Sequence, residues 1–346
     1  MSNQPLVSIM IPNYNHSRYL DECILSAKNQ TYPNIEIILL DNASEDQSIQ
    51  TAAKYMGEKV RICRNPSNIL NGTYHVLDQL AGGKYRMLLC ADDFIAPDFI
   101  AKAVDIMEQY PNVGYVHGER DFITDTGEVL ELEPFYRCSF IAPGRDVMPI
   151  YMVTTVAHAS QGIYRSETFH SRGGYDMEVD HMNVDRLLWF YLSYISDYAY
   201  IREKMSKIRV GNQTETFITQ SNFQHPMLCH STLKEMVRFA KAKGLEAVYN
   251  REAEALERLA RDFINYAAGM LATGDLVCAG RYLEYIALLS EQVTRQEVYI
   301  RLIRMQRKED AIDMAYLNRI SRQALQKPRN YEPPMHYKLL KLEVLQ

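Results

Sequence analysis

The sequence predicts an α/β domain with a parallel sheet, followed by an all-helical domain. Over about the first 120 residues, short apolar runs rich in β-branched residues alternate with segments of helical periodicity, which is typical of a sheet covered by helices. From about Pro226 to Lys327 the chain is rich in Ala, Leu, Glu, Arg and Lys at helical spacing. We therefore expect residues 1–224 to form the first domain and residues 225–346 the second.

The elements of the first domain follow one another in a β-α order. Strands are expected over Val7 to Ile11, Ile35 to Leu40, Val60 to Cys63, Tyr85 to Cys90 and Val113 to Val116. Helices are expected around Leu20, Ile24 and Ala27, around Ile49, Ala53 and Met56, from Gly72, from Pro97 to Met107, and near Asp185. Between about Gly118 and Gln224 the pattern is less regular.

Two segments of the second domain have patterns of their own. AAGMLATGDLVCAGRYLEYIA predicts two helices hinged at Gly274 and Asp275, as in a helical-hairpin repeat, although one copy also fits a plain helical bundle. The last residues, MHYKLLKLEVLQ, combine Lys and Leu at helical spacing. We interpret them as a docked terminal helix, with a helix on a membrane surface as the alternative.

Composition excludes several classes of protein. The 38 basic and 43 acidic residues give a net charge of -5, so a nucleic-acid partner is not expected. The six cysteines form no CxxC pair and are expected to be reduced thiols. The first residues lack a basic segment, and no apolar run reaches the length of about 18 residues that a membrane helix requires. We expect a soluble cytoplasmic protein, with a peripheral position at the inner face of the membrane as the alternative.

Polar residues follow three of the expected strands. They are Asn13 to Asn15, Asp41 to Ser44, and the adjacent carboxylates Asp92 and Asp93. Open parallel sheets bind ligands outside the carboxyl ends of their strands. A divalent cation could bridge Asp92 and Asp93 to a diphosphate, although either residue could instead cap the helix near Pro97 or face solvent.

Four blocks in order resemble family 2 glycosyltransferases. VSIMIPNYN, NQTYPNIEIILLDNASEDQS and AGGKYRMLLCADDFIAPDF are similar to the donor-binding half, and GGYD followed by VDRLLWF is similar to the family's Gly-Gly-aromatic-Asp turn and Glu-Asp helix. The resemblance implies a glycosyltransferase A-type fold, with a donor half over about 1–118 and an acceptor half over about 119–224. A nucleotidyltransferase or a dinucleotide-dependent oxidoreductase is disfavoured because no glycine follows the first strand.

The resemblance also implies how the donor binds. Pro12 and Tyr14 would lie against the nucleotide base, with Asn15 beside them, and the loop at Asp41 and Asn42 would read the edge of the base. Asn42 stands where many relatives carry a second aspartate, and its amide oxygen could accept the N3–H of uracil or thymine. The sequence favours a UDP-sugar, with a dTDP-sugar next. For Asp41, an Asx-type turn that holds the loop is equally expected.

The remaining roles come from the same resemblance. Asp92 would lie near the ribose and Asp93 would bind Mn²⁺ or Mg²⁺, while Cys90 replaces an acidic residue and receives no chemical role. Asp185 matches the family's general base, and Asp180 and Glu178 are alternative bases. The purely structural interpretation of Asp185 is a carboxylate that stabilises the N-terminus of a helix. Arg209 resembles an arginine that closes over the diphosphate. His158, His170 and His181 are interpreted as structural residues, and Asn68 and Asn71 as turn residues.

The function implied is an inverting transfer of a sugar from a nucleotide diphosphate donor to a hydroxyl of a saccharide, lipid-linked or protein acceptor, in cell-surface polysaccharide or glycoconjugate assembly. The helical domain is expected to bind a partner protein or to form a homo-oligomer. A catalytically weakened interaction module is the alternative, because the chain departs from the family pattern at Asn42, Tyr74, His75, Cys90 and Val184.

Overall fold

The structure is a computed structural model that describes residues 4–69, 72–175, 184–211, 215–323 and 330–340. The chain divides into two compact units. The first unit takes in 1–148, 156–210 and 330–346, and the second takes in 149–155 and 211–329. The second unit thus begins before residue 225, where we expected the boundary, because Gln220 is held by the helices that follow it: its carbonyl accepts the Tyr282 hydroxyl at 2.9 Å.

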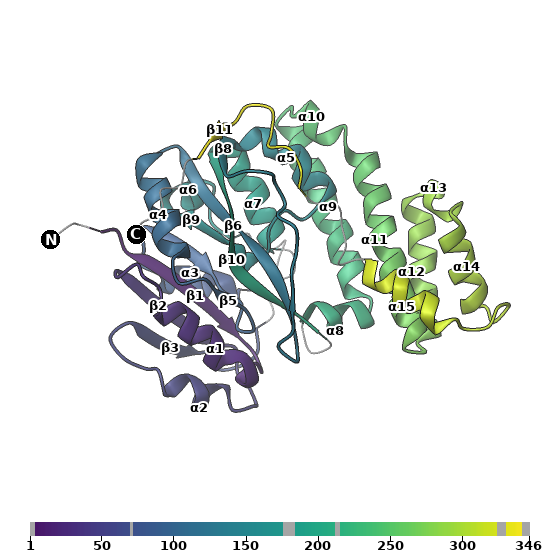
Figure 1. Ribbon diagram of the computed structural model, residues 1–346, viewed down its shortest axis with the longest axis horizontal. Coiled ribbons are helices and arrows are strands. Elements are labelled where there is room, and N and C mark those ends of the chain that lie inside the picture. Colours follow the sequence, from purple (N-terminus) through teal and green to yellow (C-terminus); the bar gives the residue numbers. More distant parts are fainter. Residues whose placement is uncertain (1–3, 70–71, 176–183, 212–214, 324–329, 341–346) are drawn as a thin grey trace. The chain divides into compact units, whose positions relative to one another are not determined.

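A mixed sheet forms the framework of the first unit (Figure 1). Its described strands are β1 (Val7–Asn13), β2 (Ile35–Asp41), β3 (Val60–Arg64), β4 (Tyr85–Leu88), β5 (Phe94–Ile95), β6 (Val113–Thr124), β7 (Val129–Leu130), β8 (Phe140–Pro143), β9 (Gly162–Arg165), β10 (Asp197–Val210) and β11 (Lys338–Leu339). They lie in the order β11-β8-β10-β6-β9-β4-β1-β2-β3, with β5 on β10 and β7 on β6. β1 is parallel to β2 and β4, whereas β9 is antiparallel to β4 and β6. The expected α/β fold class is confirmed, with a sheet that is mixed.

Helices cover both faces of this sheet. They are α1 (Ser17–Lys28), α2 (Ser48–Ala53), α3 (Thr73–Leu80), α4 (Phe99–Gln109), α5 (Gly144–Val153), the short 3-10 helix η1 (Ala159–Gln161), α6 (Ser166–Ser171) and α7 (Val184–Ile195). α3 packs on β1 and β2, α4 packs on β6, and α7 also contacts β6. The periodic residues Leu20, Ile24 and Ala27 of α1 are fully buried, as their spacing predicted.

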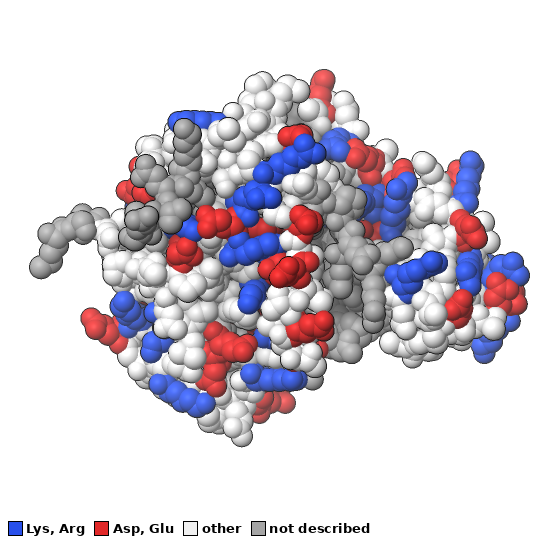
Figure 2. All heavy atoms as spheres, in the orientation of Figure 1, with Lys and Arg blue, Asp and Glu red and all other residues white. Residues whose placement is uncertain are grey.

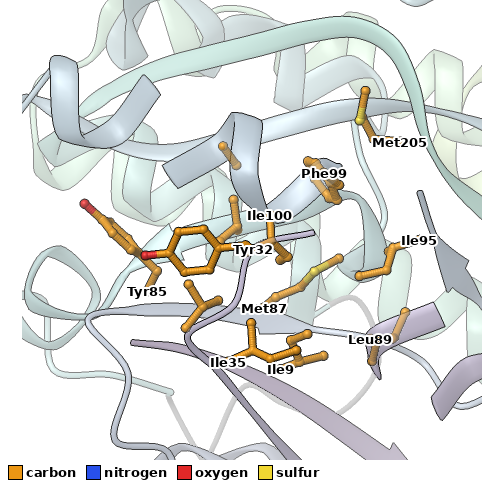
Figure 3. Close-up of a cluster of buried hydrophobic side chains, with 14 of the residues drawn as sticks. Ile9, Tyr32, Ile35, Tyr85, Met87, Leu89, Ile95, Phe99, Ile100 and Met205 are labelled. Carbon is orange, nitrogen blue, oxygen red and sulfur yellow. The ribbon is translucent and has the colours of Figure 1, made fainter. Parts of the chain in front are cut away.

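The main apolar core lies between the parallel strands and the helices α1 and α4. Figure 3 shows Ile9 of β1 and Met87 of β4 facing Phe99 and Ile100 of α4. Met205 of β10 lies on the far side of Phe99 in this view. Alternate residues of each strand enter this cluster, since side chains along a strand point to opposite faces. The packed core therefore holds the parallel strands in register with one another. Their carboxyl ends carry the polar residues.

The strand β6 is much longer than the segment Val113 to Val116 that we expected. Its continuation contains His117, Glu119 and Arg120, which have the composition of a loop but are buried. Partners inside the fold make the burial of Glu119 and Arg120 tolerable, because buried polar groups are usually hydrogen-bonded. The Tyr200 hydroxyl donates to Glu119 at 2.6 Å, and Arg120 donates to the Gln161 side chain at 2.7 Å. Such partners cannot be identified from local sequence.

The second unit is helical, as the sequence predicted. Its helices are α8 (Glu215–Ser221), α9 (Gln224–Ala242), α10 (Glu246–Tyr249), α11 (Glu252–Ala272), α12 (Leu276–Leu289), α13 (Glu291–Thr294), α14 (Glu297–Gln306) and α15 (Met314–Gln323). α11 and α12 form the expected hairpin. Gly274 at its turn has a φ of +84°, and the Asp275 side chain caps α12 by accepting the backbone N–H of Cys278.

The expectation of a terminal helix over MHYKLLKLEVLQ is wrong within its described part. Lys338–Leu339 form β11, which pairs antiparallel with β8. The free edge of β8 offers backbone hydrogen bonds, and the preceding segment is anchored where Tyr331 packs on Phe135, with ring centroids 5.0 Å apart. This edge pairing overrides the local helical spacing of Lys and Leu. Residues 341–346 lie outside the described part of the chain.

No helix in the described ranges is both long and apolar enough to cross a membrane. On the face in view in Figure 2, basic and acidic side chains are intermixed. This distribution agrees with the net charge of -5 that made a nucleic-acid partner unexpected.

Gly162→Ala should destabilise the first unit. A Cβ at this position would lie 2.4 Å from Cη2 of Trp189 and 2.7 Å from Cδ2 of the buried His117, so both rings would have to move. We expect a loss of about 1–3 kcal/mol in the free energy of unfolding. Urea denaturation followed by the fluorescence of Trp189, the sole tryptophan of the chain, measures it.

The matched control is Gly57→Ala, whose added Cβ meets no atom within 4 Å. It should leave the denaturation midpoint within the range of a neutral surface change. Equal midpoints for the two variants would show that the packing of Gly162 under Trp189 is not tight.

Candidate active site

The carboxyl ends of three parallel strands meet at one edge of the sheet. β1 ends at Asn13, which is paired in register with Asp41 at the end of β2, and β4 runs on into the segment that carries Asp92 and Asp93. Parallel strands place these ends side by side, so the polar residues identified in the sequence lie at a common edge.

Asp41 holds this edge together. Its carboxylate is fully buried and accepts the Asn13 side-chain amide at 2.9 Å and the backbone N–H of Ser44 at 3.0 Å. The Arg64 guanidinium lies 3.3 Å away. The bond to Ser44 is the turn that the sequence suggested as one role for Asp41. The structure thus gives Asp41 an architectural part, and contact with a base remains a proposal.

Asn42 is also occupied by the protein itself. Its amide oxygen accepts the Asn65 side chain at 2.9 Å and the Ile69 backbone N–H at 3.0 Å. Its amide nitrogen donates to the Asn68 side chain at 2.6 Å and to the Ile69 carbonyl at 2.9 Å. These four bonds tie the segment after β3 to the end of β2. They also give Asn68 its place, whereas Asn71 lies outside the described residues.

The residues after β1 differ in how much of each side chain is free. Tyr14 is 40% exposed, and Pro12 is partly buried within β1. Asn15 adopts a φ of +56°, and its side-chain oxygen accepts the Glu45 backbone N–H at 2.8 Å. Asn15 therefore holds the loop after β2, and the Tyr14 ring is the exposed surface that this segment offers to a ligand.

An acidic cluster follows β4. Ligand atoms of Cys90, Asp92 and Asp93 all lie within 4.8 Å of one another. The Asp93 side chain is only 3% exposed, and burial together with the neighbouring Asp92 charge raises the pKa of its carboxyl well above the ordinary value. Keeping Asp93 ionised is therefore unfavourable in the protein alone, and a cation beside it would relieve this.

Two hydrogen bonds orient the Asp93 carboxylate. The Ser160 hydroxyl of η1 donates to it at 2.6 Å, and the Arg209 backbone N–H of β10 donates at 2.8 Å. The same Ser160 oxygen accepts the Cys90 backbone N–H at 2.9 Å. Sequence reasoning missed Ser160, since no motif marks it and its partner Asp93 is 67 positions away.

Asp185 reaches the same 3-10 helix from α7. Its carboxylate accepts the backbone N–H of Ala159, next to Ser160, and that of Arg186. Burial raises the pKa of the Asp185 carboxyl. Burial raises the pKa of the Cys90 thiol well above its ordinary value, and the charges of Asp93 and Asp92 add to this effect. The charge of Asp185 makes a smaller contribution in the same direction. The structure thus brings Asp185 and the acidic cluster together around η1.

Arg209 is buried behind the cluster. Its guanidinium donates to the carbonyls of Asp92 at 3.0 Å and Thr124 at 2.9 Å, and it pairs with the Glu22 carboxylate at 3.1 Å. It also stacks over the Tyr19 ring, 4.0 Å from the centroid. The guanidinium is therefore engaged in shaping the loop that carries Asp92 and Asp93.

The histidines considered in the sequence have structural surroundings. His158 precedes η1, where its backbone N–H donates to the Gln161 side chain at 2.8 Å. His170 lies 2.9 Å from the Asp78 carboxylate. His181 and the alternative bases Glu178 and Asp180 lie outside the described residues.

The donor set of the acidic cluster fits a divalent cation. Carboxylate oxygens are the ligands that Mn²⁺ and Mg²⁺ prefer, and Asp92 and Asp93 offer them on adjacent residues at a strand end. Within the described ranges, the one group of three possible metal ligands that lie close together is Cys90, Asp92 and Asp93.

Comparisons with known proteins agree with this architecture. Residues 8–157 match the model of glycosyl transferase family 2. An uncharacterized glycosyltransferase of Haemophilus influenzae is 36% identical over 133 residues, which cover 38% of this chain and 53% of that protein. One of Rickettsia felis is 25% identical over 300 residues, covering 74% of this chain and 50% of that protein. The chain therefore spans about half the length of these curated relatives.

A solved structure extends the likeness to the fold of the whole chain. TarS 1–349 of S. aureus, in complex with UDP, superposes with a TM-score of 0.55 at 13% identity, covering 98% of this chain and 97% of that one. At this identity the likeness concerns the fold alone. Residues 8–157 thus match glycosyl transferase family 2, and the solved structure shows that the chain shares the fold of TarS.

Proposed function

We propose that the chain is an inverting, metal-dependent glycosyltransferase that uses a nucleotide diphosphate sugar. The observation that carries this proposal is the convergence of Asp92 and Asp93 with Asp185 around the short helix η1, from segments far apart in the sequence. A pair of carboxylates suited to a cation and a separate, partly buried carboxylate suited to proton transfer are the two groups that such a reaction requires.

Asp93 would hold the cation, with Asp92 beside it near the ribose. Mn²⁺ or Mg²⁺ bound there would screen the negative charge on the departing nucleoside diphosphate. The protein contributes orientation: the bonds from Ser160 and from the Arg209 backbone fix Asp93, and the Arg209 side chain fixes the carbonyl of Asp92. We accordingly assign Arg209 a positioning role, in addition to any contact with the diphosphate.

Asp185 would act as the general base. Its carboxylate would remove the proton of the acceptor hydroxyl while the hydroxyl oxygen attacks the anomeric carbon and the bond to the diphosphate breaks. A single displacement of this kind inverts the configuration at that carbon. The raised pKa of Asp185 supports the role, because a base is most effective when its pKa moves toward the working pH.

For the donor we favour a UDP-sugar, with a dTDP-sugar next. UDP is the nucleotide in the TarS complex, which has the same fold, and the exposed Tyr14 ring could stack on a pyrimidine base. Because the side chain of Asn42 is used by its neighbours, we assign edge recognition to the backbone of the Asp41–Asn42 loop. The acceptor would be a hydroxyl group of a saccharide, lipid-linked or protein compound.

The direct test is turnover of purified chain with UDP-, dTDP- and GDP-sugars in the presence of Mn²⁺. Release of the nucleoside diphosphate measures donor use, and NMR of the product gives the configuration of the new bond. We expect release with one nucleotide and an inverted product. A retained configuration would contradict the mechanism, and no release with any donor would favour the alternative of an inactive interaction module.

Asp93→Asn should abolish metal-dependent turnover. The amide keeps the size of the side chain but removes its charge, so we expect a loss of about 100-fold or more in kcat/KM, with the cation dependence flattened. Steady-state rates across a Mn²⁺ titration measure both effects. The control is Asp98→Asn, since Asp98 lies nearby in the sequence, at the start of α4, but pairs with Lys102 at 2.7 Å. Equal losses in the two variants would argue against a special role for Asp93.

Asp185→Asn should lower kcat while leaving donor binding unchanged. Loss of a positioned general base reduces the rate by about 10²- to 10⁴-fold. Rates and calorimetric donor affinity, measured on the same preparation, separate the two quantities. Asp180→Asn and Glu178→Gln are the comparison variants, and either one showing the larger drop in kcat would move the base to that residue.

A further inference from the structure

The Cys90 thiol lies in the acidic cluster, and the proposed reaction gives it no role. Its sulfur is within 4.8 Å of ligand oxygens of both Asp92 and Asp93. The side chain is partly exposed, whereas the backbone of Cys90 is fixed from two sides. Its N–H donates to Ser160 at 2.9 Å, and its carbonyl accepts the Cys23 thiol at 3.4 Å. The sulfur is therefore held at the cluster by its own main chain.

The distances suit coordination of a single ion by all three groups. Zinc binds sulfur at about 2.3 Å and carboxylate oxygen at about 2.0–2.2 Å, which places two ligands of one tetrahedral ion about 3.5 Å apart. The three ligand atoms are already within 4.8 Å of one another before any ion draws them together. An ion bound by all three groups would draw these atoms together by up to about 1.3 Å.

The charges of the cluster also favour a cation. Asp92 and Asp93 are adjacent carboxylates, and within the described chain no Lys or Arg side chain forms a salt bridge with either of them. The Arg209 guanidinium pairs with Glu22 and bonds the carbonyl of Asp92, and its charge acts on Asp93 less strongly than that of Asp92 does. Asp93 is buried directly after a second carboxylate, that of Asp92, and a buried charge is unfavourable unless it is paired.

We propose that Cys90 is a third ligand of this site and makes it prefer thiophilic cations. The inference rests on the proposed metal site of the glycosyltransferase and adds sulfur to its ligands. Carboxylates alone suit Mg²⁺ and Mn²⁺, but a thiolate selects softer ions such as Zn²⁺ and Cd²⁺. When the sulfur binds the ion, the thiol proton leaves to the solvent and a metal–sulfur bond forms. Zn²⁺ then competes with Mn²⁺ or Mg²⁺ for Asp92 and Asp93.

The test is a titration of the full chain with Cd²⁺, followed by the sulfur-to-metal charge-transfer absorption, and with Zn²⁺ by calorimetry. Wild type should develop the absorption with one ion per chain. Cys90→Ser should lose it, and its affinity for Zn²⁺ should fall on the order of 10- to 100-fold, while its affinity for Mn²⁺ stays unchanged. Cys90→Asp should lose the absorption and bind Mg²⁺ more tightly than wild type.

Cys63→Ser is the matched control, because Cys63 is also a partly buried free cysteine at the end of a strand, but of β3. It should behave as wild type. Absorption that persists in Cys90→Ser, or Zn²⁺ affinity equal in wild type and Cys90→Ser, would overturn the proposal.

These measurements need no sugar transfer, so their outcome is distinguishable from that of the proposed function. Turnover with Mn²⁺ but no bond between Cys90 and Cd²⁺ would overturn the proposal of a sulfur ligand. The proposed glycosyltransferase activity would then still stand. The converse result would establish the metal site and overturn the proposed reaction.

Discussion

The buried Asp93 carboxylate joins three segments that are far apart in the chain, and the geometry of the candidate site depends on it. Asp93 follows β4, Ser160 belongs to η1, and Arg209 lies near the end of β10. Its two acceptor bonds hold these segments at fixed distances. Since Ser160 also holds the backbone of Cys90 and its neighbour Ala159 holds Asp185, displacement of this one carboxylate would disturb every group of the site.

This arrangement carries an energetic conflict that a ligand can resolve. Burial and the Asp92 charge raise the pKa of Asp93, so the ionised carboxylate is unfavourable in the protein alone. The hydrogen bonds from Ser160 and Arg209 oppose that shift but do not remove it. A bound cation would favour the ionised form, because opposite charges stabilise each other strongly in a buried site. Binding of a cation is thus expected to stabilise the positions of the side chains in the site.

Sequence patterns identified the parts of the fold that depend on local periodicity. The alternation of strands and helices through Met107, the fully buried face of α1 and the hairpin at Gly274 follow from residue spacing. The length of β6 did not, because Glu119 and Arg120 look like loop residues until Tyr200 and Gln161 supply their partners. β11 was missed for a similar reason, since the edge of β8 decides its conformation.

The site shows the same division. Motif resemblance brought Asp92, Asp93 and Asp185 forward, and the structure places them around one short helix. It could not reveal that the side chains of Asn42 and Arg209 are used within the protein, because those bonds join residues distant in sequence. Ser160 was invisible for the same reason. Residue type and order thus predicted which carboxylates lie near one another, and only tertiary contacts show which side chains are bonded within the protein.

The central claim is that this edge of the sheet binds a cation together with a nucleotide diphosphate sugar. The most direct measurement is the melting temperature of the purified chain with UDP-, dTDP- and GDP-sugars, each with and without Mn²⁺. A ligand at about 100 times its Kd adds about 2.7 kcal/mol to the stability of the folded state. We predict a rise that requires both Mn²⁺ and one particular nucleotide; no rise with any donor, with or without the metal, would contradict the claim.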